Sequence, residues 1–297
     1  MGTQLESVAA VLGSRQRRRR RRSGLRLADE AARICLDRAG RTPHDVDLLV
    51  NAGLYHDRLL GEPALAAIVQ DDIEANPEDP HPGGHGTFSF DVANGACGML
   101  TGLQVVDGFL RAGTVRRAVV VASDADPGHR LSSRFPYQPA GGAILCTWEE
   151  GHGGLADVRL ATRPVDGGGL RGVVARQRRR NRLSIVEDEG FVREASALAV
   201  EVARESIDDR AVAGHDIDLL VANPLRPAFL DRVASGLGVP DDRVIRVPEA
   251  ADTHTAGLGI ALEAAQRSPS WARARTILLV SAGAGLVAGA ALLRPAG

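Results

Sequence analysis

One cysteine stands where it could act as a nucleophile. Cys97 lies in FSFDVANGACGML, residues 88–100, where a strand-like alternation leads through Asn-Gly and small residues into a helical pattern. Thioester chemistry needs a thiolate, and the free N–H groups and dipole at a helix N-terminus stabilise such an anion. Gly95 and Gly98 would let a substrate approach the backbone. We therefore predict that Cys97 is a nucleophile, with a buried core cysteine as the alternative.

The composition excludes several classes of chemistry. All 36 basic residues are arginine, and without a lysine amine the chain forms no Schiff base, anchors no pyridoxal phosphate and builds no Walker phosphate loop. Three cysteines without paired spacing argue against a disulfide framework and a zinc site, so we predict no metal and a cytoplasmic protein. A net charge of −1 gives no field that would draw the chain onto nucleic acid.

One apolar run approaches the length of a membrane span. Residues 276–293, TILLVSAGAGLVAGAALL, carry no charge and contain a GxxxG pattern. Glycine and alanine make the run only weakly hydrophobic, and its Gly-Ala-Gly turn divides it into two strand-sized segments. We therefore expect two strands here and no membrane partner.

An internal repeat sets the organisation of the chain. HDVDLLVNAG at 44–53 recurs as HDIDLLVANP at 215–224, and each copy follows an amphipathic helical pattern. VRRAVVVASDA at 115–125 corresponds to ARTILLVSAGA at 274–284, and each follows another helical pattern. Continuous runs such as LLV and AVVV are typical of strands covered on both faces, which need helical crossovers. We therefore predict a duplicated α/β unit with its helices and sheets in layers.

The repeat divides the chain into two halves without a linker. We assign residues 1–155 to the first half, which carries Cys97, and residues 156–297 to the second. Residues 162–182 are rich in glycine and arginine and show little pattern, so we expect a surface loop or an insertion there. The Cys97 segment has ADTHTAG, residues 251–257, as its counterpart in the second half, and we expect the two to meet near a pseudo-twofold axis.

Four segments resemble the ketoacyl synthase III family over roughly residues 25–294. FDVANGACGMLTGLQVVDGFLRAGTVRRAVVVASD resembles the nucleophile segment of that family, and AGGAILC its glycine- and alanine-rich strand. DIDLLVANPLRPAFLDRVASGLGVPDDRV resembles its histidine-bearing segment, and SAGAGLVAGAALLR its closing hairpin. A divergent beta-ketoacyl-[acyl-carrier-protein] synthase III implies an α/β, thiolase-like fold, with two pseudo-twofold related βαβ halves in an α/β/α/β/α body.

Two site residues implied by the resemblance stand in exchanged places. Where the family has its histidine, after the strand equivalent to DLLV, this chain has Asn223. The position of the family's asparagine falls on Asp252 without a gap, or on His254 with a two-residue deletion. We predict His254 as base or hydrogen-bond donor, Asn223 as donor to a carbonyl or enolate oxygen, and Asp252 as the group that orients the histidine. The alternatives are a histidine with local bonds and a turn asparagine before Pro224.

The resemblance also implies an oxyanion hole and a docking site. The backbone N–H groups of Cys97 and Ala284 would hold the oxyanion. The N-terminal part of the family lies near the mouth where coenzyme A phosphates or an acidic carrier protein dock, and its first strand and substrate loop are expected to be compressed here. Arginine binds phosphate through bidentate bonds, and a solvated loop is the alternative. The arginines concerned are Arg17, Arg18, Arg19, Arg20, Arg21 and Arg22.

These residues imply an acyl-thioester enzyme with no permanently bound cofactor. Cys97 would accept an acyl group from acyl-CoA or acyl carrier protein and condense it with a malonyl thioester, in fatty-acid or polyketide-like biosynthesis. The alternatives are acyl transfer to another nucleophile, and a catalytically degenerate partner subunit of a condensing heterodimer. The family dimerises through the last strand of its first half, here AVVVAS at 118–123, so we expect a homodimer or a heterodimer with a related subunit.

Overall fold

Six α-helices and twelve strands make up the described part of the computed structural model, which covers residues 2–13, 23–76, 86–128, 130–132, 134–150, 153–164, 169–177, 180–248 and 251–295. The helices are α1 (Gly24–Arg38), α2 (Leu65–Asp72), α3 (Gly98–Arg111), α4 (Phe191–Asp208), α5 (Pro227–Leu237) and α6 (Gly257–Arg267). The strands are β1 (Gly2–Leu12), β2 (Leu48–Asn51), β3 (Phe88–Asp91), β4 (Arg117–Asp124), β5 (Ala140–Glu149), β6 (Gly154–Leu155), β7 (Arg159–Thr162), β8 (Leu170–Gln177), β9 (Arg180–Glu187), β10 (Leu219–Ala222), β11 (Ile277–Gly283) and β12 (Val287–Arg294).

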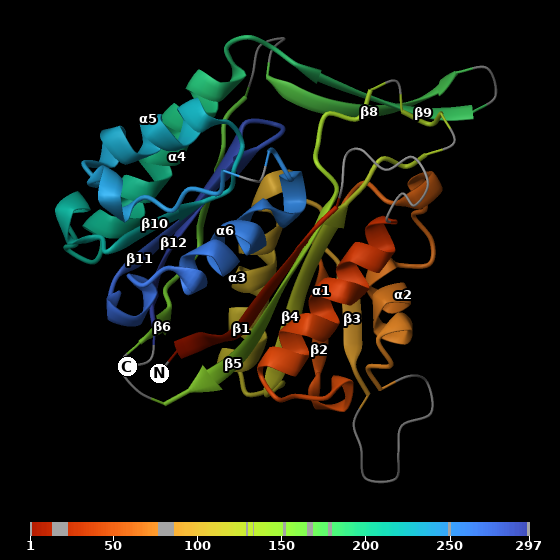
Figure 1. The fold of residues 1–297 in the computed structure, drawn as a ribbon, viewed down its shortest axis with the longest axis horizontal. Coiled ribbons are helices and arrows are strands. Elements are labelled where there is room, and N and C mark those ends of the chain that lie inside the picture. The colour runs from red at the N-terminus through yellow and green to blue at the C-terminus, as the bar shows by residue number, and fades with distance from the viewer. Residues whose placement is uncertain are drawn as a thin grey trace.

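Two larger sheets carry the fold (Figure 1). The first has the strand order β1-β5-β4-β2-β3, and β2 runs parallel to β4. The second has the order β10-β11-β12-β6, with β7 also paired to β12, and β10 runs parallel to β11. Leu48 pairs with Ala118 in the first sheet as Leu219 pairs with Ile277 in the second. The repeated strand pair predicted from the sequence is therefore present, whereas the division at residue 155 stays a prediction.

Alternating side chains on the strands divide the core into layers. Val50 of β2 faces the space between the sheets, and Leu49 faces the opposite side. Helices α3 and α6 fill the space between the sheets, α1 and α2 cover the outer face of the first sheet, and α4 and α5 cover that of the second (Figure 1). Both sheets are therefore covered on both faces, which explains the continuous apolar runs. The predicted α/β/α/β/α layering is confirmed.

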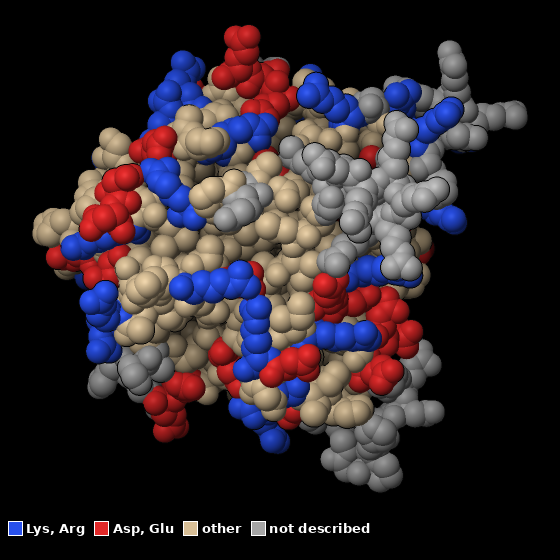
Figure 2. Space-filling view, viewed as in Figure 1, with Lys and Arg blue, Asp and Glu red and all other residues tan. Residues whose placement is uncertain are grey.

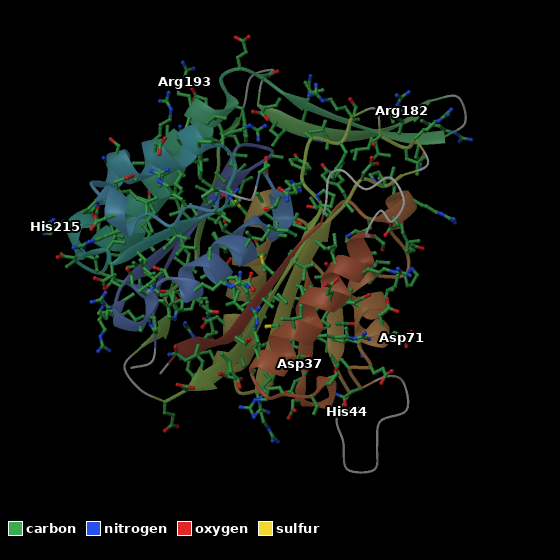
Figure 3. All side chains as sticks on the ribbon, viewed as in Figure 1. Asp37, His44, Asp71, Arg182, Arg193 and His215 are labelled. Carbon is green, nitrogen blue, oxygen red and sulfur yellow. The ribbon has the colours of Figure 1, made fainter. Side chains whose placement is uncertain are left out.

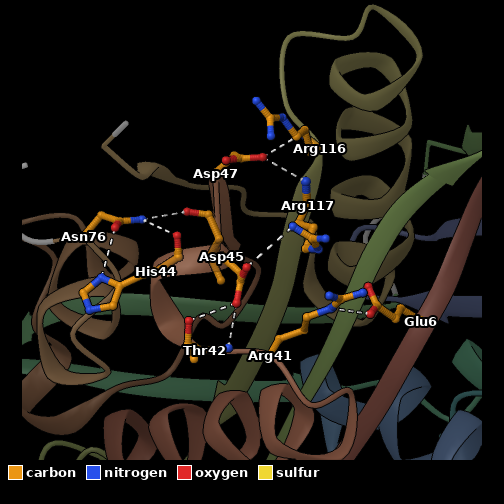
Figure 4. A network of polar contacts seen from close by, with 10 residues as sticks. Glu6, Arg41, Thr42, His44, Asp45, Asp47, Asn76, Arg116 and Arg117 are labelled. Atoms are coloured by element: carbon orange, nitrogen blue, oxygen red, sulfur yellow. Dashed lines mark hydrogen bonds and ion pairs between the residues drawn. The ribbon is translucent and has the colours of Figure 1, made fainter. Parts of the chain in front are cut away.

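The repeat extends to the hydrogen bonds that start the paired strands. Asp47 Oδ2 accepts the backbone N–H groups of Arg116 and Arg117, at 2.6 and 3.0 Å (Figure 4). In the second half, Asp218 Oδ2 accepts those of Arg275 and Thr276, at 2.7 and 2.9 Å. An aspartate after the shared His-Asp-Val/Ile thus holds the neighbouring strand in register in each half, which accounts for its place in the repeated motif.

The expectations of a compressed first strand and of a loop at residues 162–182 are wrong, whereas the arginine run expected to hold the substrate loop lies outside the described residues. Strand β1 is complete and pairs with β5. Buried polar residues such as Thr3 interrupt the apolar alternation by which this strand could be recognised in the sequence. The Thr3 hydroxyl donates to Asp107 Oδ1 at 2.8 Å. Most of residues 162–182 belongs to the hairpin β8–β9, whose ladder pairs Val174 with Leu183. Arginine and glycine concealed these strands, because neither residue shows which face of a strand is buried.

The position of the AVVVAS segment also differs from expectation. Strand β4 is hydrogen-bonded to β5 on one side and to β2 on the other, so it has no free edge through which a second chain could pair. The free edge at this end of the sheet belongs to β3. The C-terminal apolar run forms the predicted two strands, β11 and β12, and no helix in the described ranges combines the length and apolarity needed to cross a membrane.

Candidate active site

Cys97 lies where a 3₁₀ turn becomes a long helix. The turn spans Gly95–Cys97, and α3 begins at the next residue, Gly98. Side-chain size is restricted here: a Cβ on Gly98 would lie 3.0 Å from the Ala52 carbonyl oxygen. The thiol is fully buried, and Sγ lies 3.7 Å from the Val287 carbonyl oxygen. The predicted position at a helix start is confirmed.

Burial changes the expected state of this thiol. It raises the pKa of Cys97 to about 12, because a thiolate would lose its hydration. The helix start alone therefore does not provide a thiolate at neutral pH, contrary to the simple expectation from the sequence. A base must take the proton as Sγ attacks, so the site depends on a neighbouring proton acceptor.

His254 supplies a ring nitrogen that faces the Cys97 turn. It begins the turn His254–Ala256, is buried, and has a backbone φ of +50°, a strained conformation for a non-glycine residue. A Cβ on Gly95 would lie 3.6 Å from His254 Nε2 and 3.9 Å from the Ala284 nitrogen. The missing side chain of Gly95 therefore leaves space in front of the imidazole. The expected meeting of the two repeat segments is thus present in the structure.

The carboxylate that orients His254 is Asp124, at the end of β4. Asp124 Oδ2 lies 2.7 Å from His254 Nδ1 and also accepts the Thr255 hydroxyl and N–H, at 2.6 and 3.1 Å. Its Oδ1 accepts the backbone N–H groups of Leu54 and Tyr55, at 3.1 and 2.6 Å. Burial opposes the charge, but His254 and these donors together hold the pKa of Asp124 below its usual range. Asp124 is therefore ionised and keeps the Nδ1 proton of His254 in place, which leaves Nε2 free to accept one.

Asp252 does not have the predicted role toward the imidazole ring. Its Oδ1 accepts the backbone N–H of His254 at 2.9 Å, and its Oδ2 pairs with Arg226 at 3.0 Å. Burial raises the pKa of Asp252, and His254 and Arg226 oppose that rise. Asp252 therefore shapes the strained turn, whereas Asp124 orients the ring.

The internal repeat relates Asp124 and His254 to a pair of glycines in the opposite halves of the chain. In the paired strands Asp124 corresponds to Gly283, and in the paired turns His254 corresponds to Gly95, both with φ of +50°. A Cβ on Gly283 would lie 3.0 Å from the Ala96 Cβ, the same kind of close approach that Asp124 makes to the second turn. One side of the pseudo-twofold axis thus holds a His–Asp pair, and the other holds two glycines.

Both tyrosines of the chain stack at His254, a feature that sequence reasoning missed. The ring centroids of Tyr137 and His254 lie 4.3 Å apart at an interplanar angle of 12°, and those of Tyr55 and His254 lie 5.3 Å apart at 22°. Phe135 packs edge-on against Tyr137, at 5.4 Å and 85°. The tyrosines exclude water from one face of the imidazole, and their π-systems attract an imidazolium.

Asn223 lies at the end of β10, and its amide bonds to backbone. Its Nδ2 donates to the Ala282 carbonyl at 3.2 Å, and its Oδ1 accepts the Ala282 N–H at 3.1 Å. The side chain is buried and clamps β10 to β11. A donor role toward substrate stays a prediction, and it would require the amide to leave this pair of bonds.

The two predicted oxyanion donors differ in their surroundings. The Cys97 N–H donates to the Asn94 carbonyl at 3.0 Å, so it is occupied in this state. The Ala284 N–H has no acceptor among the described residues and lies on the same side of the site as Gly95. Ala284 is therefore the available donor. The run from Arg17 to Arg22 lies outside the described residues. The described residues contain no cluster of three or more potential metal ligands.

Comparisons with known proteins agree on one family. Residues 207–295 match the family described as 3-Oxoacyl-[acyl-carrier-protein (ACP)] synthase III C terminal. The Beta-ketoacyl-[acyl-carrier-protein] synthase III of Sphingopyxis alaskensis is 31% identical over 288 residues, covering 90% of this chain and 83% of the relative. The protein of the same name from Erythrobacter litoralis is 30% identical over 284 residues, with the same coverage.

Solved structures agree on the fold. The 3-oxoacyl-(acyl carrier protein) synthase III of Pseudomonas aeruginosa aligns with a TM-score of 0.81 at 21% identity, over 100% of this chain and 99% of its own. The priming beta-ketosynthase of the R1128 polyketide pathway aligns with a TM-score of 0.81 at 20% identity, over 99% and 96%. The predicted thiolase-like α/β fold is confirmed.

Proposed function

Because this chain belongs to the beta-ketoacyl-[acyl-carrier-protein] synthase III family, we propose that it is an acyl-thioester enzyme whose Cys97 takes up the acyl group. The donor is an acyl thioester of coenzyme A or of a carrier protein. The observation that carries the proposal is the 2.7 Å contact between His254 Nδ1 and Asp124 Oδ2, with Nε2 facing Gly95. A base with its orienting carboxylate, facing the turn that carries the cysteine, supports an enzyme over a catalytically degenerate partner subunit.

The proposed reaction has two steps, acylation of Cys97 and transfer of the acyl group. In the first, His254 Nε2 takes the Cys97 proton, Sγ attacks the donor carbonyl, and the donor's thiolate leaves with that proton. In the second, Nε2 takes the proton of an incoming nucleophile, which attacks the acyl carbon; Cys97 leaves as a thiolate and is reprotonated by His254. The Ala284 N–H stabilises the oxyanion in both steps. Such donors are each worth about 10²–10³ in rate.

Acyl transfer suits the site better than condensation does. A decarboxylative condensation forms an enolate, whose oxygen needs side-chain donors. The Asn223 amide bonds to Ala282, and His254 Nε2 is the side-chain atom of the described residues that lies within 4 Å of a Cβ placed on Gly95. Transfer needs only a nucleophile, one base and an oxyanion donor. Condensation with a malonyl thioester is the second candidate, because the relatives' names describe a ketoacyl synthase.

Mass spectrometry tests the first step directly. The folded protein is incubated with acyl-CoA and acyl-carrier thioesters of several chain lengths, beside the Cys97→Ala and His254→Ala variants. We expect one acyl adduct on Cys97 in the wild type, none in Cys97→Ala and strongly slowed formation in His254→Ala. No adduct from any donor in the wild type overturns the proposal.

A second assay distinguishes the two candidates. The acylated protein is given a malonyl thioester, and separately small alcohols, amines and thiols. Loss of the adduct to one of these nucleophiles, without release of carbon dioxide from the malonyl thioester, supports transfer. Carbon dioxide release that depends on the Cys97 adduct establishes condensation instead.

We further propose that the chain dimerises through the free edge of β3. Phe88 on this strand is 58% exposed and packs with Phe90 and Phe109, with centroids 5.3 and 6.4 Å away. An exposed aromatic group on an unpaired strand edge favours pairing with a second copy. Light scattering of the wild type and of Phe88→Asp tests this: we expect a dimer that the variant dissociates. A wild-type monomer contradicts it.

A further inference from the structure

One arginine joins the hairpin β8–β9 to the turn that carries His254. Arg226 Nη1 donates to Asp252 Oδ2 at 3.0 Å, and Arg226 Nη2 donates to Glu187 Oε2 at 2.6 Å. Asp252 is the residue whose other oxygen accepts the backbone N–H of His254, and Glu187 is the last residue of β9. The guanidinium therefore links the hairpin to the turn before α6.

The Arg226 side chain extends from a fixed point of the backbone. Arg226 has a φ of −155° and a ψ of 152°, the extended conformation favoured before a proline, and Pro227 begins α5. Arg226 Nη1 also donates to the Leu225 carbonyl at 2.7 Å. Backbone and guanidinium are both held, so the positions of the two carboxylates are coupled through a rigid group.

Glu187 lies where the hairpin joins the body of the protein. Strand β9 runs from the labelled Arg182 toward α4, which carries the labelled Arg193 (Figure 3). In the ladder Glu187 pairs with Leu170, whose carbonyl accepts the Gly285 N–H at 3.1 Å. Gly285 follows the available oxyanion donor in the chain. This end of the hairpin is therefore tied to the oxyanion turn directly and to the histidine turn through the arginine.

The carboxylate that Arg226 holds supports a strained backbone. His254 has a φ of +50°, which is unfavourable for a residue with a Cβ, and the matching turn of the first half has Gly95 at this position. Burial raises the pKa of Asp252, and His254 and Arg226 oppose that rise. Tyr137, which also interacts with Asp252, is neutral because burial raises its own pKa. Arg226 therefore opposes protonation of the group that holds the turn.

This pair differs from the ion pairs of the surface. Acidic and basic side chains intermingle over α4 and α5 in Figure 2, and Arg246 bridges Asp231 and Asp241 at 2.9 and 2.6 Å. Those two carboxylates are 57% and 84% exposed, whereas Asp252 is 5% exposed. Exposed pairs contribute little, but a buried pair that loses one partner leaves an uncompensated charge. Arg246 is therefore a matched control for Arg226.

We propose that Arg226 is a positioning residue for His254: by holding Asp252 it fixes the turn in which Nε2 faces the Cys97 segment, and through Glu187 it makes that position depend on the hairpin. This rests on the proposed function, because it concerns the base of the same site. Without the guanidinium, the turn can relax toward a negative φ, which moves the imidazole away from its orienting carboxylate.

The test measures single-turnover acylation of Cys97 against pH, with chemical denaturation of each variant to check folding. We expect Arg226→Gln to slow acylation about tenfold at neutral pH, because a charged hydrogen bond is lost. The acid limb of its pH profile should move to higher pH, because Asp252 is then protonated more readily. Glu187→Gln should slow acylation less than Arg226→Gln, and Arg246→Gln should stay within about twofold of the wild type.

Lysine at the same position separates charge from bridging. Arg226→Lys keeps a positive charge but lacks the planar group that reaches both carboxylates. It should keep the acid limb of the wild type and recover part of the rate lost in Arg226→Gln. An acid limb that moves equally in both variants contradicts the proposal, as does a folded Arg226→Gln with the rate and pH profile of the wild type.

A double-mutant cycle shows whether Arg226 acts through Asp252. Arg226→Gln/Asp252→Asn should acylate no more slowly than Asp252→Asn alone, because the uncharged amide no longer needs the guanidinium. Losses that add in the double variant place the effect of Arg226 elsewhere and overturn the proposal, while acylation of the wild type leaves the proposed function intact.

A readout without substrate separates this proposal from the proposed function. A wild-type protein that accepts no acyl group overturns the proposed function, and the position of His254 is then measured by nitrogen NMR of histidine-labelled protein. The His254 signal is the one absent from His254→Ala. We expect it to shift or broaden in Arg226→Gln and to stay in place in Arg246→Gln. An unchanged signal in Arg226→Gln overturns the positioning role.

Discussion

Replacing Asp124 by asparagine tests whether this carboxylate orients the His254 imidazole. The carboxylate accepts five hydrogen bonds, from Leu54, Tyr55, His254 and two groups of Thr255. An amide of the same shape has one accepting oxygen, and its NH₂ group faces donors on whichever side it lies. The asparagine amide can therefore take either of two orientations, and in each of them donors lose the acceptor that Asp124 provides.

The two arrangements have different costs. If the NH₂ group faces Leu54 and Tyr55, two partly buried N–H groups lose their acceptor, at up to about 1–3 kcal/mol each, so unfolding becomes easier by up to about 2–6 kcal/mol. If it faces His254, Nδ1 must accept and the proton moves to Nε2, so the imidazole can no longer act as base. A reversed tautomer costs about 10⁴ in rate in the serine protease triad, and loss of a charged hydrogen bond alone costs about 1.5–3 kcal/mol. We therefore expect acylation of Cys97 to slow about 10²–10⁴-fold.

The assay is single-turnover acylation by an acyl-CoA donor, followed by mass spectrometry, together with chemical denaturation of the same samples. Asp252→Asn is the matched control, because among the described residues that carboxylate bonds to the backbone N–H of His254 and to the Arg226 guanidinium, not to the imidazole ring. We expect a smaller loss of rate in the control than in Asp124→Asn. If Asp124→Asn acylates at the wild-type rate while folded, Asp124 does not hold the catalytic tautomer, and the reasoning is wrong.

Four further predictions test the same site. Burial raises the pKa of Cys97 to about 12. The rate of its alkylation by iodoacetamide in His254→Ala should therefore rise about tenfold per pH unit between pH 7 and 10. A plateau of that rate in this range would refute a buried neutral thiol. Tyr137→Leu removes the ring stacked on His254 and should slow acylation about tenfold. Tyr137→Phe keeps that ring, and its acylation rate should stay within twofold of the wild type. Equal rates in the two variants would show that stacking does not contribute. Gly95→Ala should nearly abolish acylation while the protein stays folded, since its methyl group would lie 3.6 Å from the imidazole; a normal rate would show that substrate does not occupy this space. Asn223→Ala should lower the free energy of unfolding by about 1–3 kcal/mol, measured by denaturation; a large loss of rate without loss of stability would restore the predicted donor role.

Most of the fold was predictable because its signals are local. The repeat of HDVDLLV and HDIDLLV, with helical patterns around it, predicts the paired strands and layered helices that the structure contains. The errors fall where local pattern and burial disagree. Strand β1 buries polar side chains such as Thr3, and the hairpin β8–β9 is largely exposed and rich in arginine. Periodicity detects a strand only when one of its faces is clearly apolar.

The sequence by itself determined the duplicated architecture, the position of Cys97 at a helix start and the presence of His254 in the matching segment. These depend on residue order within short stretches. Only the tertiary structure decided that Asp124, 130 residues from His254, orients the imidazole, and that both tyrosines stack on it. It also decided that the thiol is neutral, because a pKa depends on the water and charges around a group. Such surroundings arise only when the two halves close around the pseudo-twofold axis, bringing β4 to the turn that begins at His254.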